Sequence, residues 1–293
     1  MARGRKAVVV ALDAGKSFIA DEPFQLAAAL SYYTLLSMAP LLLIVTGFAG
    51  FMLGQQEVQR ELLTQMQDLV GEEGASLMRT VIERADRPDQ GLVPMTVGFI
   101  LMVLGATTVF SQLQASLNRI NGVEAAPSNA VFGFLWTRLV AFAVVLGIGF
   151  LLLVSLVMSA VLTALYNQVD RHLPGAPILW QLLNEGVSLA LITVLIATLF
   201  KFVPNIRIAW RDTWIGAFTT AVLFTIGKVL IGIYLGQASV GSAYGAAGSA
   251  VVLMVWVYYA SLILFFGATL THVIARHRGS PVGPNRYGRR RAS

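Results

Sequence analysis

Two charged residues, Glu185 and Lys228, interrupt otherwise apolar segments of the sequence. An unpaired ion in hydrocarbon costs at least ~2.5 kcal/mol, so a charge in such a segment usually faces a partner or water. In helices that rise roughly 1.5 Å per residue, Glu185 lies about 10 to 12 Å after the start of its segment, and Lys228 lies a similar distance before the end of its own segment. On adjacent, antiparallel helices both would therefore have the same depth from the outer side. Two interpretations follow: a static ion pair that fixes the register of the two helices, or a pair that faces a substrate or gates its passage.

Tyrosines form adjacent pairs in two other places, Tyr32 with Tyr33 and Tyr258 with Tyr259. Pro40 follows the first pair and removes one backbone hydrogen bond from its helix. A buried tyrosine hydroxyl more often satisfies a neighbouring helix than a ligand. The pairs are therefore expected either to pack between helices or to line one central cavity.

A run rich in Gly, Ser and Ala places Gly241, Gly245 and Ser249 at a spacing of four, with Tyr244 and Gly248 among them. Small residues at this spacing let another helix approach closely. The same glycines also permit a broken helix that faces a water-filled cavity. Helix packing and a broken helix are the two interpretations of this run.

No catalytic constellation accompanies these residues in the sequence. There is no cysteine, and His172, His272 and His277 have no carboxylate at a spacing typical of a metal site or a catalytic triad. A Gly-rich phosphate loop with its lysine is also missing. We therefore expect neither an enzyme nor a bound metal or cofactor.

Membrane-spanning helices are the elements that must position these side chains. Of 293 residues, 56% are hydrophobic and 12% charged, and the mean hydropathy of +0.72 is too high for a chain with a wetted surface. Because about 20 apolar residues cross a bilayer, we predict an all-α integral membrane protein with six transmembrane helices. Their predicted ranges are 24–54, 92–117, 132–166, 178–202, 213–236 and 245–274.

Three further parts flank or interrupt this transmembrane domain of residues 23–275. Residues 1–22 place apolar side chains on one helical face, as in an amphipathic helix on the membrane surface. Residues 55–90 carry a net charge of −4 and are predicted to form a helical loop outside the cytoplasm. Residues 276–293 form a basic tail that is expected to be disordered.

The basic residues predict the orientation. With both termini in the cytoplasm, the inner segments hold 15 Lys and Arg residues and the outer loops hold 5. Positive charge gathers on the cytoplasmic side of membrane proteins. The sequence pI of 9.8 is explained in the same way, and no nucleic-acid partner is expected.

Two stretches of the sequence carry a family resemblance. Residues 28–40 have the sequence AALSYYTLLSMAP, which resembles the opening span of the YihY/BrkB family of bacterial inner-membrane proteins. The second stretch begins with Pro204 and continues through the sequences WRD at 210–212, GK at 227–228, YL at 234–235, SAYGAAGS at 242–249, WVYY at 256–259 and GA at 267–268. The resemblance covers residues 10–275 and implies a six-span protein of the bacterial inner membrane, once labelled a ribonuclease and better regarded as a transporter or exporter. The family commonly has Glu at the position of Thr269, which weakens any mechanism that needs a carboxylate there.

These observations predict a transporter that moves an amphipathic or anionic solute, a lipid among the candidates, through a cavity between the spans. The alternative is an envelope-maintenance or assembly factor that docks partners on the acidic outer loop. Expected partners are membrane lipids and the unknown solute. The small-residue stripes serve a homo-oligomer as well as they serve a single bundle.

Overall fold

The computed structural model describes residues 2–37, 108–125, 177–237 and 248–291, with short helical pieces between residues 59 and 79. The predicted third span and most of the acidic loop lie outside the described residues. So do Pro40, Gly241, Tyr244 and Gly245.

Three long helices carry most of the described apolar sequence, α6 (Pro177–Phe202), α7 (Trp210–Gln237) and α9 (Gly248–His277). Each contains a segment long and apolar enough to cross a membrane. The helices predicted at 178–202, 213–236 and 245–274 are thus confirmed. The total of six spans and the cytoplasmic location of the termini stay predictions.

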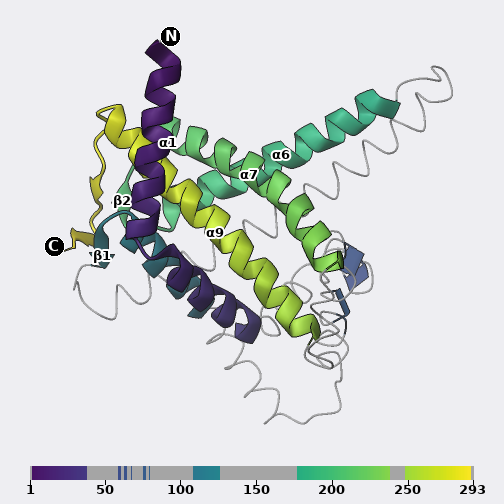
Figure 1. Ribbon diagram of the computed structural model, residues 1–293. Coiled ribbons are helices and arrows are strands. Elements are labelled where there is room, and N and C mark those ends of the chain that lie inside the picture. Colours follow the sequence, from purple (N-terminus) through teal and green to yellow (C-terminus); the bar gives the residue numbers. More distant parts are fainter. Residues whose placement is uncertain are drawn as a thin grey trace, which may run out of the picture.

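Further helical segments among the described residues pack against this group. The N-terminal helix α1 (Ala2–Ala20) crosses α9 near the C-terminal end of α9 (Figure 1). Its Ala14 is buried with Leu270 and Val273 of α9, while Leu12 and Ile19 are exposed. Residues 23–37 and 108–120 are also helical, and they fall in the first two predicted spans.

Glycines and threonines interlock α7 with α9. A Cβ atom added to Gly267 would lie 2.7 Å from Thr220 Cγ2, and one added to Gly216 would lie 2.7 Å from Thr271 Cβ. Because glycine has no side chain at these two positions, the backbones of α7 and α9 can approach each other closely. The pairing of early residues of α7 with late residues of α9 shows that the helices run antiparallel.

Hydroxyl groups in these helices bond within their own helix. Thr193, Thr220, Thr269 and Thr271 each donate to the backbone carbonyl four residues earlier, at 2.7 to 3.0 Å. Such bonds satisfy a buried hydroxyl without a partner on another helix. Thr269, where the related family commonly has Glu, is 2% exposed and bonded in this way.

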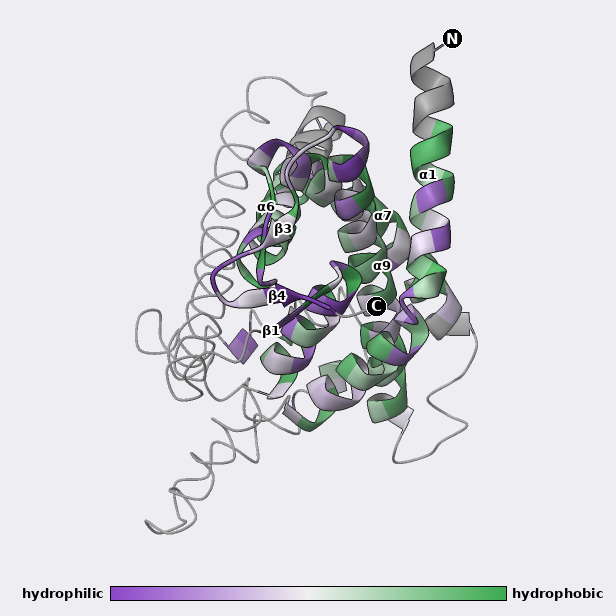
Figure 2. Ribbon diagram, turned by 90° about the vertical axis from the view of Figure 1, so that its left-hand side faces the viewer, coloured by the Kyte–Doolittle hydropathy of each residue, from purple (hydrophilic) through white to green (hydrophobic). Residues whose placement is uncertain are grey.

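Two short antiparallel ladders cover one end of the helices. β1 (Val123–Ala125) pairs with β4 (Gly288–Arg290), and β2 (Ile206–Arg207) pairs with β3 (Gly283–Pro284). We call this region the polar end: the ends of α6 and α9, the start of α7, and the four strands. Figure 2 shows hydrophilic residues over these strands and hydrophobic residues along the helices.

The structure differs here from the predicted disordered tail, because residues 283–284 and 288–290 form strands. Glu124 explains part of the difference. Arg289 and Arg291 lie 3.3 and 3.8 Å from its carboxylate, so the basic tail has an acidic partner that is distant in sequence. The Arg291 backbone N–H also donates to the Gly122 carbonyl at 3.0 Å.

Candidate functional site

Lys228 lies on α7 on the side away from its exposed apolar residues. Ile226, Leu230 and Ile233 are each more than half exposed, as expected for side chains that face lipid. At about 100° of rotation per residue, Lys228 is turned roughly 200° from Ile226. It is nevertheless only half-buried. Lys228 therefore lies on the side of α7 that faces the other helices, and its side chain is not fully buried.

Glu185 is not the partner of Lys228. Within the described ranges, no ion pair or hydrogen bond joins these two side chains, and Glu185 is exposed near the start of α6. The helices α6 and α7 diverge with distance from the polar end (Figure 1). Similar depth along two helices does not bring side chains together when the helix axes separate. The static-pair interpretation is therefore wrong for the described structure.

The predicted tyrosines occupy two different places. A Cβ atom added to Gly227 would lie 3.0 Å from the Tyr259 hydroxyl, so Tyr259 packs against the residue that precedes Lys228. Tyr258 packs on the main hydrophobic cluster. The rings of Tyr32 and Tyr33 lie edge to face at 5.7 Å, and Tyr32 is 53% exposed. Of the four, Tyr259 is the one with a described contact at Gly227, the residue that precedes Lys228.

Of the small residues in the Gly-rich run, Gly248 is buried at the first position of α9. The side chain of Ser249 lies outside the described residues. Helix packing through glycine instead involves Gly216, Gly227 and Gly267. The two helices alternate in supplying the small residue, so neither helix alone shows a regular stripe of small residues that would predict this contact.

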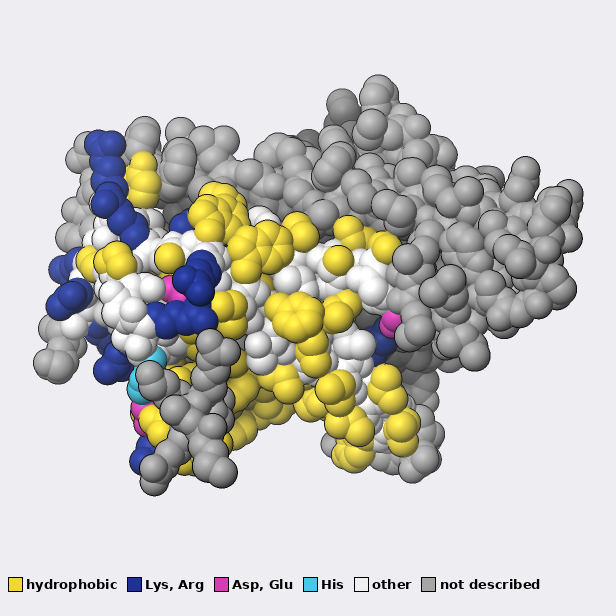
Figure 3. All heavy atoms as spheres, turned by 90° about the horizontal axis from the view of Figure 1, so that it is seen from above, with side chains coloured by type: hydrophobic (Ala, Val, Ile, Leu, Met, Phe, Trp, Pro, Cys, Tyr) yellow, Lys and Arg dark blue, Asp and Glu magenta, His cyan; other side chains and the backbone are white. Residues whose placement is uncertain are grey.

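Basic side chains gather at the polar end. Figure 3 shows Lys and Arg over this end and hydrophobic side chains over the helices beside it. The exposed rings of Trp210 and Trp214 are stacked at 6.5 Å, and Lys201 Nζ lies 5.3 Å from the centroid of the Trp210 ring. Exposed tryptophans with basic residues are typical of a membrane–water interface. The polar end thus has the composition that is typical of the level at which helices leave a membrane.

A buried carboxylate connects this end to the segment after α9. Asp212, in the first turn of α7, is 1% exposed, and its Oδ1 accepts a hydrogen bond of 3.1 Å from Arg278. Its Oδ2 is buried without a hydrogen-bond partner. A buried carboxylate needs such a cation, because the interior cannot replace the water that it loses. Asp212 belongs to the stretch WRD at 210–212, where no spacing in the sequence indicates this role.

Hydrogen bonds between side chains and backbone close the same end. Asn118 Oδ1 accepts from the Asn205 backbone N–H at 2.7 Å, and His272 Nδ1 lies 3.1 Å from Asn121 Oδ1. Arg119 forms an ion pair with Glu22. These bonds join segments that are distant in sequence, so the described helices are held together at this level.

Asp21 lies in the turn after α1, close to this network. Burial raises the pKa of its carboxyl from 3.8 to about 6, although Arg119 and Arg291 act in the opposite direction. Desolvation disfavours the charged form of an acid. The charge of Asp21 therefore changes closer to neutral pH than that of an ordinary aspartate.

A second feature of the polar end is a pocket of about 490 Å³ between α1 and α9. Asp13 and His277 form one wall, with Asp13 Oδ2 at 2.9 Å from His277 Nε2. Lys16, Ser17 and Arg276 also line it. These residues are not among the candidates predicted from the sequence. The sequence feature that could have indicated the pocket is the pair of charges at Asp13 and Lys16, which interrupt an apolar run.

Comparisons with known proteins agree with a membrane location. The profile of the family described as virulence factor BrkB matches residues 14–290. A UPF0761 membrane protein of Chromobacterium violaceum is 27% identical over 262 residues, which are 87% of this chain and 59% of that protein. One of Pseudoalteromonas translucida is 28% identical over 253 residues, 84% of this chain and 79% of its own length.

The chain thus spans about three fifths of the Chromobacterium relative. No solved structure matches it. The family profile nevertheless extends from α1 to the last strand and includes both Lys228 and the polar end. The resemblance noted in the sequence is therefore confirmed, and this chain belongs to the virulence factor BrkB family of membrane proteins.

Proposed function

We propose that this protein transports an anionic or amphipathic solute, with a lipid as the leading candidate, and that Lys228 binds its negative charge. The protein is proposed to be a multi-pass protein of the bacterial inner membrane with the polar end in the cytoplasm. This orientation follows from the distribution of Lys and Arg. It places Lys228 in the outer half of the bilayer.

The observation that carries this proposal is the environment of Lys228. It lies inside the apolar segment Trp210–Tyr234, turned away from the exposed apolar side of α7. Across the described part of the chain it has neither an ion pair nor a hydrogen bond. A lone cation within a span is costly unless it meets water or a counter-ion. An anionic substrate that enters between the diverging helices would supply that counter-ion.

The bonds at the polar end support one further step. They hold the described helices together at the proposed cytoplasmic side, while α6 and α7 separate toward the other side (Figure 1). A transporter must open to one side at a time. We assign the described arrangement to a state closed at the cytoplasmic side.

Flux measured in proteoliposomes tests the proposal. Purified protein is reconstituted, and movement of fluorescent phosphatidylglycerol between leaflets is compared with that of fluorescent phosphatidylcholine. Lys228→Gln should slow movement of the anionic lipid about tenfold, as expected for loss of a charge-assisted contact worth about 1.4 kcal/mol. Lys228→Arg should retain most of the rate. Arg211→Gln removes one exposed charge from the polar end of the same helix and should leave the rate unchanged.

Wild-type flux equal to that of protein-free vesicles, for both lipids, would refute lipid transport. If Lys228→Gln lowered stability but left flux intact, Lys228 would serve only the fold. The rival function, docking of envelope partners on the acidic loop, depends on residues 55–90, most of which lie outside the described structure. It predicts that neutralising that loop abolishes function in cells while flux in vesicles stays unaffected.

A further inference from the structure

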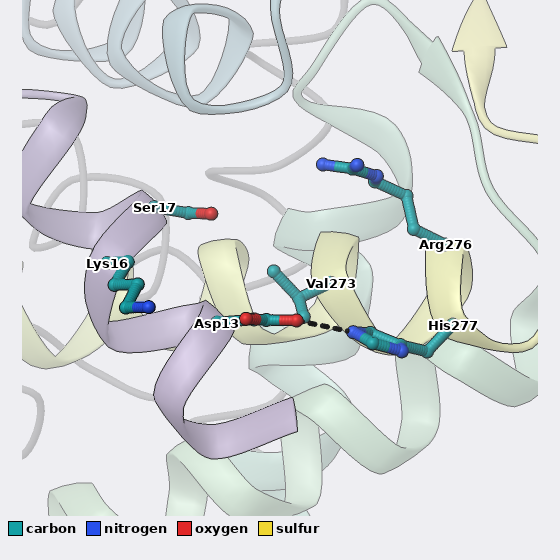
Figure 4. Close-up of a pocket in the computed structure, with 6 residues that line it drawn as sticks. All are labelled: Asp13, Lys16, Ser17, Val273, Arg276 and His277. Atoms are coloured by element: carbon teal, nitrogen blue, oxygen red, sulfur yellow. Dashed lines mark hydrogen bonds and ion pairs between the residues drawn. The ribbon is translucent and has the colours of Figure 1, made fainter. Parts of the chain in front are cut away.

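The pocket between α1 and α9 has the composition of an anion site. Its lining consists of Asp13, Lys16, Ser17, Val273, Arg276 and His277 (Figure 4). Two of these residues are cationic at neutral pH and one is a carboxylate. Ser17 adds a hydroxyl donor, and the side chains of Ser17 and Arg276 point into the same space between the helices.

The two cations of this pocket are available to a ligand. Among the residues that the structure describes, Lys16 and Arg276 take part in no ion pair and no hydrogen bond, and both are exposed. Asp13, in contrast, is already engaged by His277 at 2.9 Å. The negative charge in the pocket is thus partnered and the positive charges are not. Guanidinium and ammonium groups beside a hydroxyl are the donors that phosphate oxygens accept from.

The position of the pocket favours a ligand at the membrane surface. Lys16 is turned only about 40° from the exposed Leu12 around α1, so the cation borders the exposed apolar side of that helix. Arg276 lies in the last turn of α9, at the end that Trp210 and Trp214 mark as an interface. Apolar side chains next to unpaired cations are the arrangement that an amphipathic helix offers to anionic lipids.

We propose that this pocket binds a phosphate group, held by Lys16, Ser17 and Arg276, at the membrane surface. The group belongs either to an anionic lipid headgroup or to a soluble phosphate compound. The site is separate from Lys228 and does not depend on the proposed transport. Binding there would tie α1 to α9 and so fix the N-terminal helix against the end of the bundle.

Binding to the purified full chain in nonionic detergent tests this proposal. Titration calorimetry is performed with short-chain phosphatidylglycerol, with short-chain phosphatidylcholine and with inorganic phosphate. Lys16→Gln combined with Arg276→Gln should weaken binding of phosphatidylglycerol at least tenfold. The matched control, Arg207→Gln with Arg211→Gln, removes two exposed charges from the same end and should change affinity less than twofold.

Asp13→Asn gives a result of opposite sign. It removes the single carboxylate among the lining residues, so affinity for an anion should rise severalfold. Loss of folding cannot imitate a gain of affinity. Helical circular dichroism and the elution volume of each variant provide the check on folding.

The ligands distinguish the two sources. Binding of phosphatidylglycerol well above that of inorganic phosphate supports a lipid headgroup, and similar affinity for both supports a soluble phosphate. Absence of binding by either would overturn the proposal. Equal losses in the pocket variant and in the Arg207 and Arg211 control would also overturn it, because the attraction would then be a general effect of positive charge.

Discussion

Replacement of Gly267 by Ala puts a methyl group where α7 and α9 leave no space. The added Cβ would lie 2.7 Å from Thr220 Cγ2 and 2.8 Å from Thr220 Cβ. Carbon atoms in contact prefer about 3.5 to 4.0 Å. Thr220 Oγ1 lies closer still to the added Cβ, so either Thr220 must rotate or the helices must separate by more than ~1 Å.

The expected cost combines three contributions. Overpacking in a well-packed core costs about 1–3 kcal/mol. Rotation of Thr220 would break its hydrogen bond of 2.7 Å to the Gly216 carbonyl, which is worth about 1 kcal/mol. The higher helix propensity of Ala returns up to about 1 kcal/mol. Gly267→Ala should therefore destabilise the protein by about 1–3 kcal/mol.

Gly232 provides the matched control, because it lies in α7 and no heavy atom is within 4 Å of its added Cβ. Gly232→Ala should be neutral or slightly stabilising. Reversible unfolding in mixed micelles, followed by circular dichroism, measures both variants. Thr220→Ala removes the hydroxyl and the Cγ2 that oppose the new methyl group, so it should recover at least about 1 kcal/mol in the Gly267→Ala background.

Equal stability of Gly267→Ala and Gly232→Ala would refute the close approach of α7 and α9. Strict additivity of Gly267→Ala with Thr220→Ala would refute the specific contact between these residues.

Three other predictions concern the polar end. Because the pKa of Asp21 is raised to about 6, the folded state binds more protons than the unfolded state between about pH 4 and pH 6, and stability should fall as pH rises through this window. Asp21→Asn should remove this pH dependence and stabilise the protein at pH 7 by about 1 kcal/mol. This value is well below the free energy of the full pKa shift, because water screens the half-buried carboxyl. Arg278→Gln should destabilise by about 2–4 kcal/mol, because it strips the buried Asp212 carboxylate of its cation, and the further change Asp212→Asn should restore part of the loss in unfolding experiments. The sequence has no cysteine, so Arg207→Cys introduces a single thiol for labelling. A membrane-impermeant maleimide should react with this thiol in inverted vesicles and not in intact spheroplasts. The reverse result would contradict the proposed orientation.

Hydropathy was sufficient to predict the three long helices, because a span needs only length and apolar composition. Their ends were predicted less well. α7 begins at Trp210 although the predicted span began at 213, because Arg211 and Asp212 are polar residues that a helix accommodates at an interface. α9 continues to His277 for the same reason.

Contacts between distant segments could not be predicted in this way. Glu185 and Lys228 have similar depths from the outer ends of their predicted spans. Depth, however, does not determine the direction of a side chain or the angle between helix axes. The strands at the polar end are two or three residues long and pair across large distances in sequence, so they leave no periodic pattern. The pocket that holds Lys16 and Arg276 arises from the same kind of contact, between α1 and α9.

The ladder between β1 and β4 joins residues made early in translation with residues made late. At about 5–20 residues per second, a ribosome needs about 10 to 30 s to proceed from Val123 to Gly288. During that time β1 has no strand to pair with, and the Glu124 carboxylate has neither Arg289 nor Arg291 beside it. Closure of this end is therefore a late event in biogenesis. With the polar end in the cytoplasm, as proposed, cleavage of residues 121–125 by a cytoplasmic protease would show how far the assembly of a nascent chain has proceeded.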